Sequence, residues 1–153
     1  MLNRIFSLIA ILLLFTISAY ASGSEGKVTG VISGAHCALN GMACPSNHNL
    51  TREELPGIFT KDKKFYFITN VPQSFLAQWK AGSEISVEGK IYSDEFGIDA
   101  KKISLKESGK WHTVFEDSKI IDDMGHKVSL SDAVVVKDKW YCPKCAMMHE
   151  KNK

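Results

Sequence analysis

The sequence predicts a mainly β protein, a small five-stranded barrel with one short helix, followed by a C-terminal β-hairpin appendage. Residues 84–92 (EISVEGKIY) alternate apolar and polar side chains, which is the two-residue period of a half-buried strand. Between residues 28 and 105, β-rich segments and one helical segment at residues 72–79 follow the order strand, strand, strand, helix, strand, strand.

Residues 1–21 predict a cleavable secretory signal peptide. Arg4 supplies the positive charge, residues 5–17 are almost entirely apolar, and Ala19-Tyr20-Ala21 forms a small-residue cleavage site. The apolar run is shorter than the roughly 20 residues that span a bilayer, so we expect no membrane span after cleavage. The mature chain would have 153 − 21 = 132 residues and a periplasmic or secreted location.

The first half of the barrel is predicted from three short β-rich segments. Residues 28–33 favour the first strand, and residues 57–60 and 64–69 favour a strand pair. Residues 34–56 contain Gly, Asn, Pro, Ser and two Cys without a long apolar period, which predicts a Cys-bearing loop. Residues 51–54 could form a helical turn within this loop. The helix cannot continue beyond one turn, because Pro56 follows.

The last strand of the barrel is predicted over residues 98–105. Its apolar residues share one phase up to Ala100 and the opposite phase from Ile103 onward. A change of phase by one residue within a strand predicts a β-bulge, here near residues 101–102.

This order of elements is that of the OB-fold, a five-stranded Greek-key barrel. Residues 81–106 (AGSEISVEGKIYSDEFGIDAKKISLK) also resemble the last two strands of exported and nucleic-acid-associated OB domains. The resemblance covers about residues 27–106 and implies an OB-like barrel domain at residues 22–106, with residues 34–56 as an addition to it. Another small β-sandwich or barrel is the alternative.

The charge balance argues against a nucleic-acid partner. Without Arg4, the mature chain has 18 of the 19 Lys and Arg residues against 17 Asp and Glu. A nucleic-acid-binding domain usually shows a basic excess or stripe, which is absent here. We therefore expect no nucleic acid, and a metal ion or an exported protein as the partner.

Residues 107–153 are predicted to form an appendage. Strand-like segments lie at residues 111–115 and 119–121, and residues 133–136 and 139–141 predict a hairpin around Lys137-Asp138. The sequence Cys142-Pro143-Lys144-Cys145 follows directly.

This C-terminal motif resembles a zinc-ribbon or rubredoxin knuckle, in which a hairpin turn points two sulfurs at one metal. Ala146 stands where such knuckles commonly have Gly. The resemblance implies a second cysteine pair, which only Cys37 and Cys44 can supply. The resulting hypothesis is one metal site with four cysteine ligands: Cys37, Cys44, Cys142 and Cys145.

Further soft or borderline donors lie near both cysteine pairs. Thiolate, thioether and imidazole together suit Zn or Cu(I) rather than Ca or Mg. The absence of a C-x-x-C-H sequence excludes a covalently attached haem. The secondary candidates for metal ligands are His36, His48, His149, Met147 and Met148.

Two other uses of the cysteines stay open. An even number of cysteines in an exported chain favours disulfides, which would make the protein a disulfide-stapled OB-fold interaction module. Cys37, Cys44, Cys142 and Cys145 then allow three connectivities. Alternatively, Cys142 and Cys145 form a redox-active dithiol. A thioredoxin fold is excluded because only eight residues follow Cys145. No phosphate-binding loop, dinucleotide fingerprint or hydrolase motif is present, which favours a binding protein over an enzyme.

Overall fold

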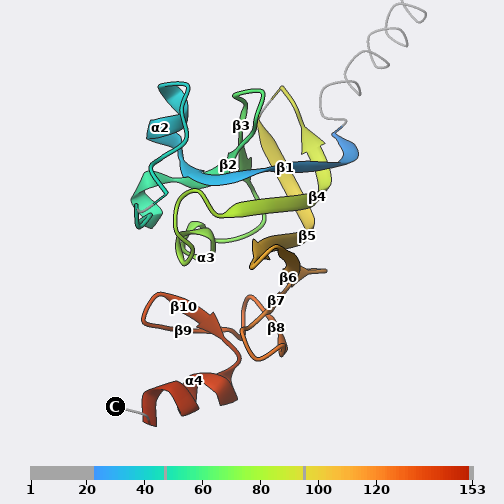
Figure 1. Cartoon of the computed structure of the whole chain (residues 1–153). Helices are drawn as coiled ribbons and strands as arrows, with labels where there is room; N and C mark the ends of the chain where they lie inside the picture. Colours follow the sequence, from blue (N-terminus) through green and yellow to red (C-terminus); the bar gives the residue numbers. More distant parts are fainter. Residues whose placement is uncertain (1–22, 47, 95, 152–153) are drawn as a thin grey trace, which may run out of the picture.

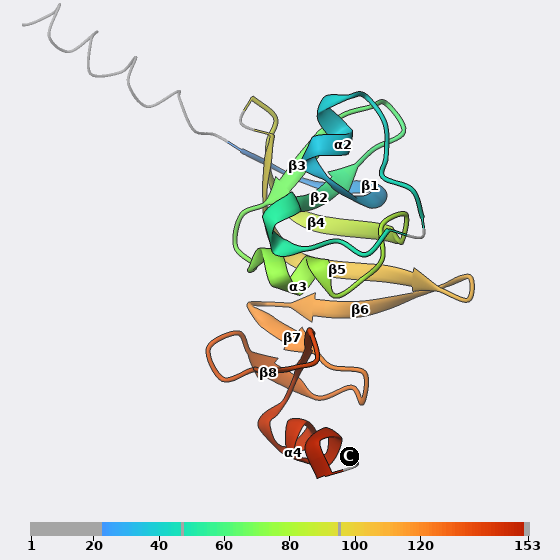
Figure 2. The same ribbon diagram turned by 90° about the vertical axis from the view of Figure 1, so that its left-hand side faces the viewer.

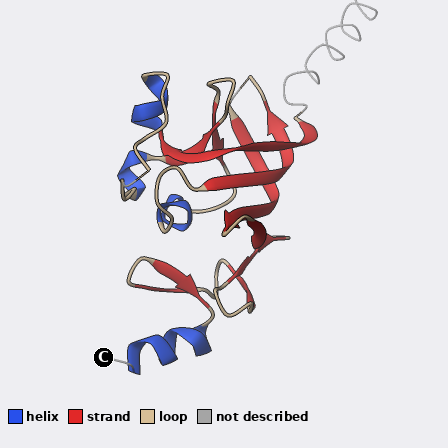
Figure 3. Cartoon of the chain, in the orientation of Figure 1, coloured by secondary structure: helices blue, strands red, loops and turns tan. Residues whose placement is uncertain are grey.

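The computed structural model describes residues 23–46, 48–94 and 96–151, and the expected signal peptide lies outside them. An OB-like barrel occupies the first part of the described chain, and smaller strands and a terminal helix follow (Figures 1 and 3). No helix in the described ranges has the length and apolar character needed to cross a membrane. The barrel elements are β1 (Ser24–Gly34), β2 (Pro56–Phe59), β3 (Phe65–Ile68), α3 (Gln73–Ala77), β4 (Glu84–Tyr92) and β5 (Gly97–Glu107).

The five strands close into a barrel with the predicted topology. The strand β1 pairs antiparallel with both β2 and β4, and β2 continues to β3. The parallel pairing of β3 with β5, where Phe67 lies opposite Gly97, closes the ring. The helix α3 lies between β3 and β4 in the sequence, so the prediction of an OB-like barrel with one short helix is confirmed.

The predicted bulge is present in β5. Glu88 pairs with Lys102 while the next residue, Gly89, pairs with Ala100, so Lys101 is the extra residue. A Cβ on Gly89 would lie 2.1 Å from the Asp99 carbonyl oxygen, which explains why a glycine stands at this point. The extra residue reverses which alternate side chains of β5 point inward. Apolar residues therefore face the barrel interior both before and after the bulge.

The barrel interior is filled by aliphatic side chains from all five strands. In β3 the burial alternates along the strand, with Tyr66 and Ile68 inside. The helix α3 adds Phe75 and Leu76, both almost completely buried. The strand residues at the centre of this core are Ile32, Ile58, Ile68, Ile85, Val87, Ile98, Ile103 and Leu105.

The segment between β1 and β2 contains more structure than the predicted loop. A short helix, α2 (Ala35–Leu39), follows β1 directly, and the 3-10 turn η2 (Arg52–Glu54) matches the predicted helical turn. The Thr51 N–H donates to the Glu54 carboxylate at 2.8 Å and fixes the start of η2.

The sheet continues from the barrel into the C-terminal part. The strands β6 (Lys110–Glu116), β7 (Lys119–Ile121) and β8 (Lys127–Ser129) follow β5 in one antiparallel sheet. Phe115 and Ile120 are buried in the same core cluster as the barrel residues. In Figure 2 these strands extend the barrel sheet toward the C-terminal helix.

A hairpin and a helix complete the chain. The predicted hairpin is confirmed as β9 (Val134–Val136) and β10 (Lys139–Tyr141). Its turn residues Lys137 and Asp138 have φ of 49° and 63°, the conformation of tight two-residue hairpin turns. The helix α4 (Pro143–Lys151) follows β10 after a single residue, Cys142.

Candidate metal centre

Four side chains near the C-terminus form a group that could hold a metal ion. Asp122, His126, Cys142 and Cys145 each offer one ligand atom, and these atoms all lie within 4.8 Å of one another. Two residues come from the loop between β7 and β8, and two from the start of α4. The sheet extension and the hairpin meet at this point.

The loop between β7 and β8 is shaped by the Asp122 side chain. Its Oδ1 accepts hydrogen bonds from the backbone N–H groups of Met124 (3.1 Å) and His126 (2.9 Å). The Gly125 N–H donates to the Asp122 carbonyl, and Gly125 has φ of 81°, which suits a residue without Cβ. An aspartate that accepts bonds from the following backbone is a common turn former, and here it also brings His126 back over the carboxylate.

The start of α4 positions both cysteines. Pro143 is the first helical residue, a position where its missing N–H costs no hydrogen bond. The Cys142 Sγ accepts the Cys145 N–H at 3.2 Å, much as a capping side chain would. The Cys142 N–H donates to Asp122 Oδ2 at 3.2 Å and ties the helix start to the β7–β8 loop.

The motif therefore lies on a different element from the one expected. The resemblance to a knuckle implied that the two sulfurs sit at the turn of a hairpin. The hairpin turn is at Lys137 and Asp138 instead, and Cys142-Pro143-Lys144-Cys145 forms the junction between β10 and α4. The proline at the first helical position was a signal for this arrangement in the sequence.

The ligand atoms differ in exposure. The Asp122 side chain is fully buried and Cys145 is completely inaccessible, while Cys142 is half-buried. The His126 side chain is 55% exposed and lies at the open side of the group. Its Nδ1 is 3.1 Å from the Cys145 Sγ and 3.6 Å from the Asp122 Oδ1. The group is closed toward the protein and accessible from solvent through His126.

The surroundings shift the pKa values of the Asp122 carboxyl and the Cys145 thiol in opposite directions. Burial raises the pKa of Asp122, but hydrogen bonds from the Cys145 thiol and the surrounding backbone N–H groups outweigh burial and leave this pKa below its ordinary value. The pKa of Cys145 is raised to about 12, first by its hydrogen bond with Cys142 and then by burial and the Asp122 carboxylate. Beside the ionised Asp122, a second negative charge on the Cys145 sulfur is unfavourable. A bound divalent cation would reverse this preference, because a metal ion deprotonates a thiol that coordinates it.

The first cysteine pair does not belong to this group. Cys37 and Cys44 form a disulfide with a Cα–Cα distance of 5.4 Å. Cys37 lies in α2, at the far end of the molecule from α4 (Figure 1). The expectation that four cysteines converge on one metal is therefore corrected, since two of them are oxidised and distant. The alternative disulfide assignment is confirmed for Cys37–Cys44, whereas Cys142 and Cys145 are free thiols.

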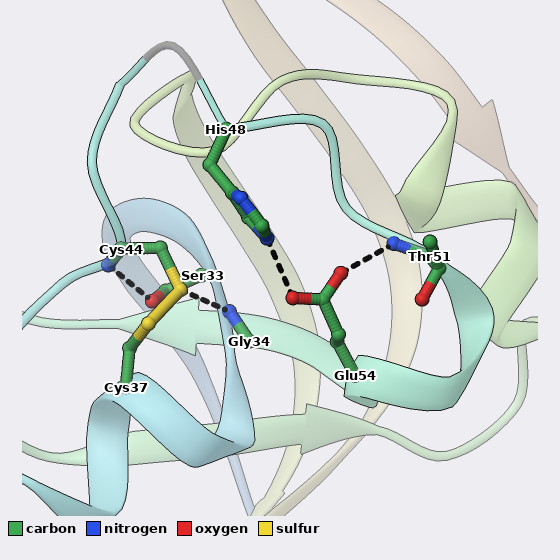
Figure 4. Close-up of polar contacts among 7 residues, drawn as sticks. All are labelled: Ser33, Gly34, Cys37, Cys44, His48, Thr51 and Glu54. Carbon is green, nitrogen blue, oxygen red and sulfur yellow. Dashed lines mark hydrogen bonds and ion pairs between the residues drawn. A yellow bond between two sulfur atoms is a disulfide. The ribbon is translucent and has the colours of Figure 1, made fainter.

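The disulfide is embedded in a hydrogen-bonded loop (Figure 4). The Cys44 N–H donates to the Ser33 hydroxyl at 2.9 Å, and the Gly34 N–H donates to the Cys44 sulfur at 3.4 Å. Close by, His48 Nε2 lies 2.5 Å from a Glu54 carboxylate oxygen. This region is a structural anchor for the segment between β1 and β2.

Loss of this disulfide should destabilise the barrel by about 2 kcal/mol, because the bond closes a short loop in the unfolded chain. The two half-cystines are separated by seven positions. We expect the variant Cys37→Ala/Cys44→Ala to lower the free energy of unfolding in urea by this amount. Dithiothreitol should produce a similar loss in the wild type and none in the variant. Equal midpoints for wild type and variant without reductant would contradict the prediction.

The secondary candidates lie outside the group. His48 pairs with Glu54, and His36 is exposed on α2. On α4, His149 packs its ring on Tyr141 with centroids 4.4 Å apart, and Met147 and Met148 are exposed. The group therefore contains two of the predicted ligands, Cys142 and Cys145.

The sequence prediction did not include the other two members of the group. Asp122 and His126 form no recognised metal-binding motif in the sequence. Their four-residue spacing around a glycine was the available signal, since such a loop can turn both side chains to one side.

No protein-family model, no curated protein and no solved structure matches this chain. The function must therefore be argued from the geometry and chemistry of the group.

Proposed function

We propose that this protein is an exported zinc-binding protein whose C-terminal part holds Zn²⁺ through Asp122, His126, Cys142 and Cys145. The observation that carries the proposal is the convergence of four ligand atoms within 4.8 Å. In a tetrahedral zinc site with ordinary bond lengths, neighbouring ligand atoms are about 3.3 to 3.8 Å apart. The His126–Asp122 separation of 3.6 Å lies in this range and the His126–Cys145 separation of 3.1 Å is close to it.

The donor set favours zinc over copper. Two thiolates and an imidazole suit both Zn²⁺ and Cu(I), but the fourth donor is a carboxylate, which is a hard ligand. The carboxylate is fully buried and directed into the group by three backbone hydrogen bonds. The three methionines nearest in sequence, Met124, Met147 and Met148, are exposed.

The number of ligands favours a binding or structural role. Catalytic zinc sites usually keep one position for water or substrate and use three protein ligands, whereas structural sites use four. The four side chains join the β7–β8 loop to the start of α4. A metal at this point would hold the C-terminal elements together.

Metal binding is tested on the chain from Ser22 onward, purified and reduced at Cys142 and Cys145. We expect one equivalent of zinc by elemental analysis. Cobalt substitution should give the visible bands of tetrahedral Co²⁺ together with thiolate-to-metal charge transfer. Cys145→Ser and His126→Ala should each weaken zinc binding by at least about tenfold.

The matched control is the variant Cys37→Ala/Cys44→Ala, which removes the other cysteine pair and should bind zinc like the wild type. The proposal is wrong if the wild type binds no zinc or cobalt. It is also wrong if binding survives the variant Cys142→Ser/Cys145→Ser.

A redox-active dithiol is the second candidate. Cys142 and Cys145 are free thiols three positions apart at the start of a helix, the spacing of Cys-X-X-Cys redox motifs. In this case the two thiols would form a disulfide and pass two electrons and two protons to a disulfide of an exported partner. Rapid alkylation of Cys142 at neutral pH and reduction of a disulfide substrate by the reduced protein would favour this function over zinc binding.

A further inference from the structure

A cleft of about 570 Å³ lies between the barrel and the C-terminal hairpin, a size typical of small-molecule sites. The chain has three tryptophans, and all of them line this cleft: Trp79, Trp111 and Trp140. They come from the segment after α3, from β6 and from β10, so three separate elements contribute one indole each (Figure 1). Convergence of every tryptophan on one cavity indicates a recognition surface.

Two of the three rings are held in place by the core. Phe75 of α3 is almost completely buried, and its ring packs edge-on against Trp79 at 5.0 Å and Trp140 at 6.0 Å between centroids. The Trp140 N–H of the backbone also donates to the Gln78 side-chain oxygen at 3.3 Å. Trp111 is 46% exposed and forms the outer wall. The walls formed by Trp79 and Trp140 are therefore preorganised, which reduces the entropy lost on binding.

The charged residues of the cleft have a negative excess. Glu107, Asp122 and Asp123 line it, against one cation, Lys139. A zinc ion on Asp122, two thiolates and His126 would leave the metal group with a formal charge of about −1, so metal binding would not remove this excess. Indole faces and nearby carboxylates both attract cations, and tryptophan is the strongest cation–π partner among the aromatic side chains.

We propose that this cleft binds a small organic cation bearing a quaternary ammonium group. Methyl groups around a positive nitrogen contact indole faces on several sides and need no hydrogen-bond acceptor. The fully buried Asp122 carboxylate is held by three backbone hydrogen bonds in the metal group, so it contributes negative charge near the cleft and no direct contact with the ligand. The metal group and the cleft are separate sites that adjoin at Asp122.

The experiment is a titration of the chain from Ser22 onward with choline and with its uncharged isostere, 3,3-dimethylbutan-1-ol. Since all three tryptophans line the cleft, intrinsic tryptophan fluorescence reports directly on it. We expect saturable quenching by choline and about tenfold weaker binding of the neutral alcohol, because only the charge differs. The titration is run on the purified protein and again with one equivalent of Zn²⁺, and binding in either state supports the site.

Variants separate the cleft from the rest of the surface. By calorimetry, Trp111→Leu should weaken choline binding about fivefold because it removes one cation–π partner. Glu107→Gln should also weaken binding, and Lys139→Gln should strengthen it. The control is Phe96→Leu, because Phe96 is 52% exposed and does not line the cleft.

Three results would overturn the proposal. They are the absence of saturable binding with choline, equal affinity for choline and the neutral alcohol, and an equal loss in Phe96→Leu and Trp111→Leu. None of them bears on zinc binding, which is measured by cobalt spectra and elemental analysis.

Discussion

Replacing Phe75 by alanine is expected to lower the free energy of unfolding by about 4 kcal/mol, the range found when a buried phenylalanine is truncated. Phe75 is 2% exposed and contacts Trp79, Phe115 and Trp140. Its ring therefore lies where α3, the strand β6 and the hairpin strand β10 meet. The truncation should leave a cavity that these aromatic neighbours cannot fill.

The loss is measured by urea unfolding, followed by both circular dichroism and tryptophan fluorescence. Two of the three tryptophans pack on Phe75, so the emission spectrum of the folded variant should also shift. Phe96→Ala is the control and should change stability by less than about 0.5 kcal/mol, because this side chain is largely exposed. A loss below about 1 kcal/mol for Phe75→Ala would contradict the role of Phe75 as the junction of barrel and hairpin.

The barrel could be predicted because its signals are local. The alternation in residues 84–92 recurs as β4 with the same bounds, and the phase change in the next segment recurs as the bulge at Lys101. Both follow from the two-residue period of a strand with one buried face. The hairpin around Lys137 and Asp138 was predicted for the same reason, since its turn lies between two short β-rich runs.

The candidate site could be predicted only in part, because it depends on contacts between distant segments. Cys142 and Cys145 form a recognisable motif within four positions. Their partners Asp122 and His126 lie some 20 positions earlier and reach the cysteines only because β7, β8 and α4 meet in space. An aspartate in a glycine-containing turn has the same local pattern whether it is solvated or buried.

The pairing of Cys37 with Cys44 also could not be predicted from the sequence alone. The spacing of Cys37 and Cys44 allowed a disulfide, a metal ligand pair or cross-links to the C-terminal cysteines. The short helix α2 brings Cys37 next to Cys44, and no apolar period predicted that helix. The disulfide between Cys37 and Cys44 thus depends on a five-residue helix in a segment that the sequence predicted as a loop.

Zinc should stabilise the C-terminal part of the protein more than any single side chain there. Among the residues that the structure describes, the second core cluster has three buried members, Tyr141, Cys145 and Ala146, which is too little apolar surface to hold a helix firmly. A metal that binds only the folded state contributes about 4 kcal/mol when its free concentration is 1,000 times Kd. We expect this gain for the elements joined at the metal group, which are the β7–β8 loop and α4.

The measurement is amide hydrogen exchange with and without zinc, because it reports stability element by element. With zinc, the amides of α4 and of the β7–β8 loop should exchange about 1,000-fold more slowly, the factor that corresponds to this free energy. Strands β1 to β5 should change little, since their core lies in the barrel. In Cys145→Ser the slowing should disappear, and in Cys37→Ala/Cys44→Ala it should persist. Equal exchange at α4 with and without zinc would show that the four side chains do not act as a metal-dependent clamp, because a ligand that binds only the folded group must protect the segments that carry its ligands.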